Sequence, residues 1–164
     1  CGTPVKILDT RKTAPGLRVL DKMAVRLGGG TNHRIGLYDA VLIKDNHIEA
    51  AGGIAAAVAA QRRASKRPFK IEVETKTLKE VREALQCGVD MIMLDNMTNA
   101  AMKKAVDLID GRALTEASGN VNLKRVASIA ATGVDFISVG ELTHSVRAAD
   151  ISLKVEGRGL KAHG

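Results

Sequence analysis

The chain has 164 residues, of which 45% are hydrophobic and 26% charged, and its net charge is +7 at pH 7. This length suits one domain with a real core, and this composition excludes an intrinsically disordered chain. No apolar run approaches the roughly 18 residues that a transmembrane helix needs, and no signal peptide is recognisable. We therefore expect one globular domain with no membrane partner.

The two cysteines and the sparse aromatic residues exclude further classes of protein. Cys1 and Cys87 lie outside any CxxC or Cys/His cluster, so neither a zinc site nor a disulfide framework is indicated. Reduced thiols fit a cytoplasmic location. The basic charge could suit nucleic acid, but two Phe, one Tyr and no Trp offer little stacking surface for single strands. Anionic small molecules are the better match for the excess of cations.

Short apolar runs alternate with longer segments of helical periodicity along the whole chain. The predicted strands are 5–8, 40–43, 69–73, 91–94, 113–117 and 135–140. The predicted helices are 17–27, 52–64, 77–87, 98–109 and 122–131. Residues 151–155 are expected to form one more short strand or the end of a helix, and 157–164 a polar tail.

Six alternations of strand and helix predict a parallel sheet, which is either an open doubly wound sheet or a closed barrel. Neither GxGxxG nor GxxxxGK[ST] occurs, so a dinucleotide site and a P-loop are unsupported. A full eight-fold barrel needs at least about 200 residues, so a barrel here would be short of strands. The first residue is Cys1 rather than Met, which leads us to expect a piece of a longer protein.

Polar side chains follow each of the six predicted strands. Chemistry collects at the carboxyl ends of parallel strands in both architectures. One charge after one strand is commonly a solvated loop residue, but a ring of them indicates a site. The residues concerned are Thr10, Arg11 and Lys12; Lys44, Asp45, Asn46 and His47; Glu72 and Glu74; Asp95 and Asn96; Glu116, Ser118, Gly119 and Asn120; and Gly140, Glu141 and His144.

Two glutamates of the third predicted strand need positively charged or hydrogen-bonding groups near them. Glu72 and Glu74 are two residues apart and share one face of the strand, while Ile71 and Val73 share the other. Because helices cover a parallel sheet, carboxylates on a buried face need cations, a metal or hydrogen-bonding substrate. With Asp95, these acids could hold Mg²⁺ or the hydroxyls of a sugar.

Two further groups of residues suggest anion binding. Ser118-Gly119-Asn120 before a helix is either a phosphate cradle or an ordinary turn with a helix cap, and Gly140 with His144 repeats the pattern one strand later. The loop "GGGTNHRIG" at 28–36 could bring its cations together with those that follow the first two strands, forming a pocket for carboxylates. That cationic set is Arg11, His33, Arg34 and Lys44.

Six stretches, in order along the chain, resemble the quinolinate phosphoribosyltransferase family, also called nicotinate-nucleotide pyrophosphorylase (carboxylating). They are "DTRKTAPGLR", "GGGTNHRIGLYDAVLIKDNHI", "IEVET", "MIMLDNM", "EASGNV" and "SVGELTHSVRAADISL", and they cover about residues 5–155. The resemblance implies transfer of phosphoribose from phosphoribosyl pyrophosphate to the ring nitrogen of quinolinate. Nicotinate mononucleotide, CO₂ and pyrophosphate would be the products, in de novo NAD synthesis, with Mg²⁺ assisting.

The resemblance also implies a role for each matching residue. Lys12, Lys44, Glu74 and Asp95 would be catalytic, and Glu74 and Asp95 would also meet the metal. The quinolinate carboxylates would lie among Thr10, Arg11, His33, Arg34 and Lys44. Phosphoribosyl pyrophosphate would meet Lys12, Glu74, Asp95, Ser118, Gly119, Asn120, Val139, Gly140, Glu141 and His144.

Family members carry an N-terminal α/β domain before the barrel, and in their dimers it supplies a substrate-binding Arg to the partner. The resemblance therefore implies an incomplete, about six-stranded parallel α/β barrel (TIM-like) over 1–156 that lacks this domain, and a homodimer or higher homo-oligomer. Three alternatives remain. They are a paralogous protein associated with molybdenum uptake, a non-catalytic barrel that only binds anions, and a nucleic-acid binder, which only the charge of +7 favours.

Overall fold

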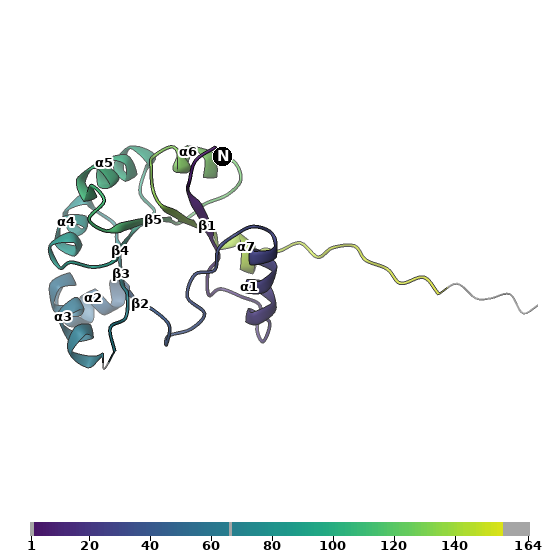
Figure 1. The fold of residues 1–164 in the computed structure, drawn as a ribbon, viewed down its shortest axis with the longest axis horizontal. Coiled ribbons are helices and arrows are strands. Elements are labelled where there is room, and N and C mark those ends of the chain that lie inside the picture. Colours follow the sequence, from purple (N-terminus) through teal and green to yellow (C-terminus); the bar gives the residue numbers. More distant parts are fainter. Residues whose placement is uncertain (1, 66, 156–164) are drawn as a thin grey trace, which may run out of the picture.

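Six parallel strands form one curled sheet in the computed structural model, which describes residues 2–65 and 67–155 (Figure 1). The strand order is β1-β6-β5-β4-β3-β2, so β1 and β2 are the two edges of the sheet. Helices lie on the outside of the curl (Figure 1). The strands are β1 (Lys6–Leu8), β2 (Val41–Ile43), β3 (Ile71–Thr75), β4 (Met91–Asp95), β5 (Leu114–Ser118) and β6 (Phe136–Ser138). An incomplete parallel α/β barrel is therefore confirmed.

Seven helices connect and cover these strands within the described ranges. They are α1 (Arg18–Leu27), α2 (Asp45–Ala51), α3 (Ile54–Ala64), α4 (Leu78–Gln86), α5 (Asn99–Ile109), α6 (Val126–Ala130) and α7 (Glu141–His144). A capping box begins α4, because Thr77 Oγ1 accepts from the Glu80 N–H and Glu80 Oε2 accepts from the Thr77 N–H. None of the helices in the described part of the chain has the length and apolar character to cross a membrane.

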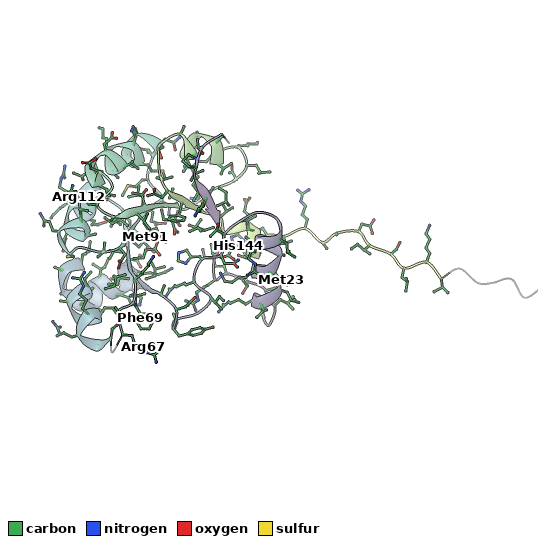
Figure 2. The ribbon with its side chains drawn as sticks, in the orientation of Figure 1. Met23, Arg67, Phe69, Met91, Arg112 and His144 are labelled. Atoms are coloured by element: carbon green, nitrogen blue, oxygen red, sulfur yellow. The ribbon has the colours of Figure 1, made fainter. Side chains whose placement is uncertain are left out.

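The apolar core lies between the sheet and the outer helices. Val73, Ile92, Leu94, Ala117 and Ile137 of the strands are fully buried. They belong to one cluster with helix residues, among them Val81, Met102, Ile109 and Ile129. The alternate residues of each strand point into the barrel, as Met91 does in Figure 2. Because the apolar residues take the helix side, polar residues such as Glu72, Glu74 and Glu116 are left to line the interior.

A loop carries the chain across the open side of the barrel between β1 and β2. Thr31 lies beside β1 in a parallel bridge with Leu8, and its N–H donates to Ile7 O at 2.8 Å. Asp9 N–H in turn donates to Thr31 O at 3.1 Å. This pairing fixes the start of the segment that contains His33 and Arg34, so the edge of the sheet positions the predicted carboxylate pocket.

The structure corrects four sequence predictions. Asp45, Asn46 and His47, predicted as loop residues, form the first turn of α2, where His47 Nδ1 accepts from Lys44 N–H at 3.0 Å. Glu141 and His144 belong to the one-turn helix α7. Both helices are too short for periodicity to reveal. The helix predicted at 122–131 shortens to α6.

The fourth correction concerns residues 151–155, which are neither strand nor helix. The chain leaves the body here, and Ile151, Leu153 and Val155 are exposed (Figure 1). Alternating apolar residues predict a strand only where a neighbouring strand pairs with them, and none of the described residues does so. The predicted polar tail, 157–164, lies outside the described residues.

Candidate active site

Two adjoining cavities open at the carboxyl ends of the strands. The first is lined by Thr10, Arg11, Lys12, His33, Arg34, Leu42, Lys44, Glu74, Met93, Asp95, Asn96, Glu116, Ser118 and Ser138. The second is lined by Thr10, Lys12, Asp95, Asn96, Ser118, Gly119, Asn120, Val121, Ser138, Gly140, Glu141 and His144. They share Thr10, Lys12, Asp95, Asn96, Ser118 and Ser138. The two predicted sub-sites therefore lie side by side and meet at common residues.

The first cavity gathers the predicted cationic set. Arg11, His33, Arg34 and Lys44 all line it, although they come from three separate loops. Burial lowers the pKa of Arg34, and the positive charge of Arg11 lowers it further. Arg11 Nε is buried without a hydrogen-bond partner in the described part of the chain. Two cations held against their mutual repulsion, one of them with an unused buried donor, favour an anion with more than one carboxylate.

The opposite wall of the first cavity is acidic. Burial raises the pKa of Glu74, and the neighbouring charge of Asp95 raises it further. Lys44 Nζ lies 4.0 Å from Glu74 Oε2, which only partly offsets this repulsion. Two neighbouring carboxylates, one of them with a raised pKa, are suited to a divalent cation or to sugar hydroxyls. The donor set at Glu74 and Asp95 thus fits the predicted Mg²⁺.

A glycine-rich cradle forms the second cavity. Asn96, Gly119 and Asn120 all have positive φ, at 53°, 94° and 50°. Asn120 Nδ2 donates to Asn96 Oδ1 at 3.0 Å, and Asn96 N–H donates to Ser118 O at 2.9 Å. A Cβ on Gly119 would overlap the Asn96 amide, and one on Gly140 would lie 2.6 Å from His144 Nε2. At Gly119 the positive φ and the close Asn96 amide both favour glycine, whereas at Gly140 a side chain would have to displace the end of the His144 ring.

Two details of the predicted phosphate site differ from expectation. The turn at Asn120 does not lead directly into a helix, because α6 begins only at Val126. The cradle is thus made by positive-φ backbone rather than by a helix start. Val139 is buried and its N–H donates to Leu8 O at 2.9 Å, so it lies behind the cavities.

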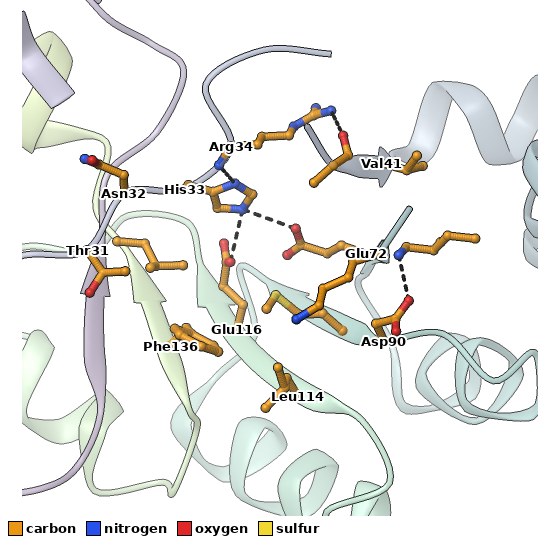
Figure 3. Close-up of a pocket in the computed structure, with 15 residues that line it drawn as sticks. Thr31, Asn32, His33, Arg34, Val41, Glu72, Asp90, Leu114, Glu116 and Phe136 are labelled. Carbon is orange, nitrogen blue, oxygen red and sulfur yellow. Dashed lines mark hydrogen bonds and ion pairs between the residues drawn. The ribbon is translucent and has the colours of Figure 1, made fainter. Parts of the chain in front are cut away.

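Glu72 does not join Glu74 and Asp95 but lies deeper in the barrel with His33 and Glu116 (Figure 3). His33 Nε2 is 3.2 Å from Glu72 Oε2 and 3.2 Å from Glu116 Oε2. Oε1 of both glutamates is buried with no hydrogen-bond partner among the described residues. We call His33, Glu72 and Glu116 the buried acid cluster.

The buried acid cluster keeps an additional proton at neutral pH. Burial raises the pKa of Glu72 to about 7. Burial would lower the pKa of His33, but the carboxylates of Glu116 and Glu72 raise it to about 10. Arg34 N–H donates to His33 Nδ1 at 2.7 Å, so in this geometry the imidazole is neutral, with its one proton on Nε2 facing the carboxyl groups, and this contact opposes the rise in pKa that the carboxylates cause.

The same contact at Nδ1 argues against a metal within the buried acid cluster. Three groups with ligand atoms within 4.8 Å of one another could surround an ion. A metal-bound imidazole, however, normally donates its other N–H to an acceptor. His33 Nδ1 meets a donor instead, the Arg34 N–H. The geometry fits proton sharing, and the ring of His33 lines the cavity with both nitrogens engaged inside the chain.

Sequence reasoning missed two buried residues and one half-buried residue that lie outside the lining of the first cavity, and one residue within that lining. Asp9, Lys22 and Asn32 form a hydrogen-bonded group that holds the segment containing His33. Asn96 was noted after its strand but given no role. A charged residue between apolar positions of α1 was the available signal for Lys22, because burial of a lysine requires a partner.

Comparisons with known proteins agree with this geometry. A family model described as quinolinate phosphoribosyl transferase, C-terminal domain, matches residues 2–154. The chain is 52% identical to a mitochondrial quinolinate phosphoribosyltransferase [decarboxylating] of Nicotiana glauca, over 93% of this chain and 49% of that protein. It is 49% identical to a probable nicotinate-nucleotide pyrophosphorylase [carboxylating] of Bacillus subtilis, over 92% of this chain and 52% of that protein.

A solved structure shows the same architecture. The nicotinate-nucleotide pyrophosphorylase of Francisella tularensis superposes with a TM-score of 0.89 at 47% identity, over 94% of this chain and 55% of that one. The chain therefore spans about half the length of the curated relatives that it matches.

Proposed function

This chain belongs to the quinolinate phosphoribosyltransferase family, and on that premise we propose that it carries phosphoribosyl transfer to quinolinate. Phosphoribosyl pyrophosphate would give its phosphoribose to the ring nitrogen, with release of pyrophosphate and then CO₂, leaving nicotinate mononucleotide. One observation carries the proposal. A cationic cavity suited to a dicarboxylate and a glycine cradle suited to phosphate share six lining residues.

The two adjoining cavities would first align the two substrates with one another. Arg11, Arg34 and Lys44 would hold the two carboxylates, so that the ring nitrogen faces the shared residues of the cavities. The cradle around Gly119 and Gly140 would hold the phosphate end of the donor. Fixing two reactants in this way removes much of the entropic barrier to their reaction.

Charge in the cavity walls then favours the transfer. Glu74 and Asp95 would stabilise positive charge that develops on the ribose, and Lys12 would meet the leaving pyrophosphate. Mg²⁺ held by the same two carboxylates would neutralise phosphate charge when bound. The set needs no residue that forms a covalent bond to substrate.

We further propose a homodimer or higher homo-oligomer and a cytoplasmic location. Light scattering of the purified chain tests the first, and a monomer at micromolar concentration would contradict it. Fractionation of source cells tests the second, since plant relatives carry names that place them in mitochondria or chloroplasts.

A pair of variants tests the assignment of the two sub-sites. Lys44→Ala is expected to weaken mainly quinolinate binding, because it removes a cation from the first cavity. Glu74→Gln is expected to weaken mainly binding of phosphoribosyl pyrophosphate with Mg²⁺. Calorimetric titration with each ligand measures both, and Glu49→Gln on the exposed side of α2 is the control. Equal losses for both ligands in each variant would contradict two separate sub-sites.

An assay for nicotinate mononucleotide with the wild-type chain tests the reaction itself. Product formation supports the proposal. Binding of both ligands without product would favour the anion-binding alternative for this half of the protein.

A further inference from the structure

The geometry points to the buried ion pair of Asp9 and Lys22 as the positioning device for the carboxylate-binding side of the cavity. This inference rests on the proposed function, because it concerns how the first cavity selects quinolinate. Neither residue lines either cavity, so neither touches a ligand there. Both act through the residues that they hold.

Asp9 binds the loop that carries His33 and Arg34. It is 0% exposed and follows the last residue of β1. Its Oδ1 accepts from His33 N–H at 2.7 Å and from Lys22 Nζ at 2.6 Å, and its Oδ2 accepts from Asn32 Nδ2 at 2.6 Å. Because Thr10 and Arg11 come next in the chain, one carboxylate fixes the start of both cation-bearing loops.

Lys22 holds the same loop from α1. Its Nζ donates also to His33 O at 2.9 Å, and its backbone carbonyl accepts from Asn32 Nδ2 at 2.7 Å. Arg18, one turn earlier on α1, donates to Arg11 O at 2.9 Å and to Ile35 O at 3.3 Å. One face of α1 thus ties together the two loops on either side of the cationic pocket.

Helix α1 buries a charged side chain and exposes apolar ones, which is the reverse of an ordinary surface helix. Lys22 is 3% exposed, whereas Val19 and Leu27 are 76% and 78% exposed, and Met23 also lies on the outer side (Figure 2). Burying a charge pair costs desolvation that its own attraction often only just offsets, so this pair is poorly explained by stability alone. What it does provide is a set of short, directional bonds to a loop backbone.

Most of these bonds hold a segment that serves one ligand and not the other. Asp9 and Lys22 bond directly to Asn32 and His33, and that segment carries His33 and Arg34, which line only the first cavity. The cradle is held by a separate contact between Asn96 and Asn120, and Thr10, which lines both cavities, is held also by its contact with Thr143. A misplacement of about 1 Å in a positioned group can lower a reaction rate about a hundredfold. Loosening the segment that carries His33 and Arg34 should likewise weaken the binding of quinolinate more than the binding of phosphoribosyl pyrophosphate.

The test replaces both charges at once. Asp9→Asn with Lys22→Met leaves no unpaired buried charge, which favours a folded product. We expect the dissociation constant for quinolinate to rise at least about tenfold and that for phosphoribosyl pyrophosphate with Mg²⁺ to stay within about twofold. The matched control is Lys103→Met with Asp107→Asn, which removes an exposed Lys–Asp pair on α5 at 2.8 Å, against 2.6 Å for the buried pair. If the double variant does not fold, Asn32→Ala carries the same comparison, because it removes the half-buried amide that joins Asp9 to the Lys22 carbonyl and leaves the ion pair intact.

A measurement without ligand separates this inference from the proposed function. Amide hydrogen exchange at His33 should be protected in the wild type and accelerated at least about tenfold in the variant, because its N–H donates to Asp9. Equal exchange in both proteins, an unchanged affinity for quinolinate, or an equal loss for both ligands would overturn the positioning role. A wild type that binds neither ligand would overturn the proposed function, while the exchange result would still decide whether the pair holds the loop.

Discussion

Removing one carboxylate from the buried acid cluster should change how stability depends on pH. Glu72 is 6% exposed, and burial raises its pKa from an ordinary 4.5 to about 7. Between these values the unfolded chain has lost the proton that the folded chain keeps. Stability from this proton is therefore fully present below pH 4.5 and is lost as the pH rises toward about 7.

The size of this change in stability follows from the width of the pH range between 4.5 and about 7. Each pH unit changes the free energy of unfolding by about 1.4 kcal/mol for one proton, so the window corresponds to about 3 kcal/mol. Glu72→Gln cannot ionise and keeps nearly the same shape. The variant should therefore gain about 3 kcal/mol relative to the wild type between pH 4.5 and pH 7.

Urea unfolding of both proteins at a series of pH values measures this difference. The ionisable groups outside the buried acid cluster are common to both chains, so their contributions largely cancel, and the difference reports the titration of the cluster as a unit. Glu49→Gln, at an exposed position of α2, is the control for the loss of one negative charge. A difference for Glu72→Gln that stays constant, or that moves in the wild type's favour as the pH rises, would refute a proton shared in the buried acid cluster.

Three more predictions concern the cradle, the core and the metal. Gly119→Ala should weaken the binding of phosphoribosyl pyrophosphate at least about tenfold by calorimetry, because its φ is 94° and a Cβ would overlap Asn96. Gly111→Ala is the control, since Gly111 has φ 68° and open space around it, and equal affinities of the two variants would contradict the cradle. Ile92→Ala should cost about 2–5 kcal/mol in urea unfolding, because Ile92 is fully buried in the core cluster, and a loss under about 1 kcal/mol would contradict that packing. Omitting Mg²⁺, with chelator present, should abolish most binding of phosphoribosyl pyrophosphate and leave quinolinate binding unchanged, whereas equal binding of the donor without Mg²⁺ would count against a metal at Glu74 and Asp95.

Short helices and unpaired segments were beyond what the sequence could predict. A segment such as α2, seven residues long, gives too few turns for an apolar stripe to emerge. Residues 151–155 show the opposite failure, since their alternating pattern is typical of a strand but no partner strand lies beside them in the described chain. Sequence periodicity reports which face of a segment could be buried, and only the surrounding structure decides whether anything buries it.

The site residues expected from the family resemblance show how much of a site a sequence motif can predict. Every residue expected to bind quinolinate lines the first cavity, and those expected to bind the donor, apart from Glu74 and Val139, line the second. Their contacts were not predictable in the same way. His33 was expected to face a substrate carboxylate, yet its Nε2 faces Glu72 and Glu116. The motif fixes which loop a side chain belongs to, while its neighbours across the barrel fix its partners.

The sequence by itself determined the parallel α/β architecture and the edge where the site lies. Both follow from local properties, namely the alternation of strand and helix and the polar residues after each strand. Only the tertiary structure decided how deep each charge sits. Glu72 and Glu74 share a face, but two residues of strand separate them by about 6.6 Å along the barrel. Glu72 therefore joins the buried acid cluster, and Glu74 lines the first cavity. The pairing of Asp9 with Lys22 likewise depends on α1 packing its charged face inward, which no local pattern encodes.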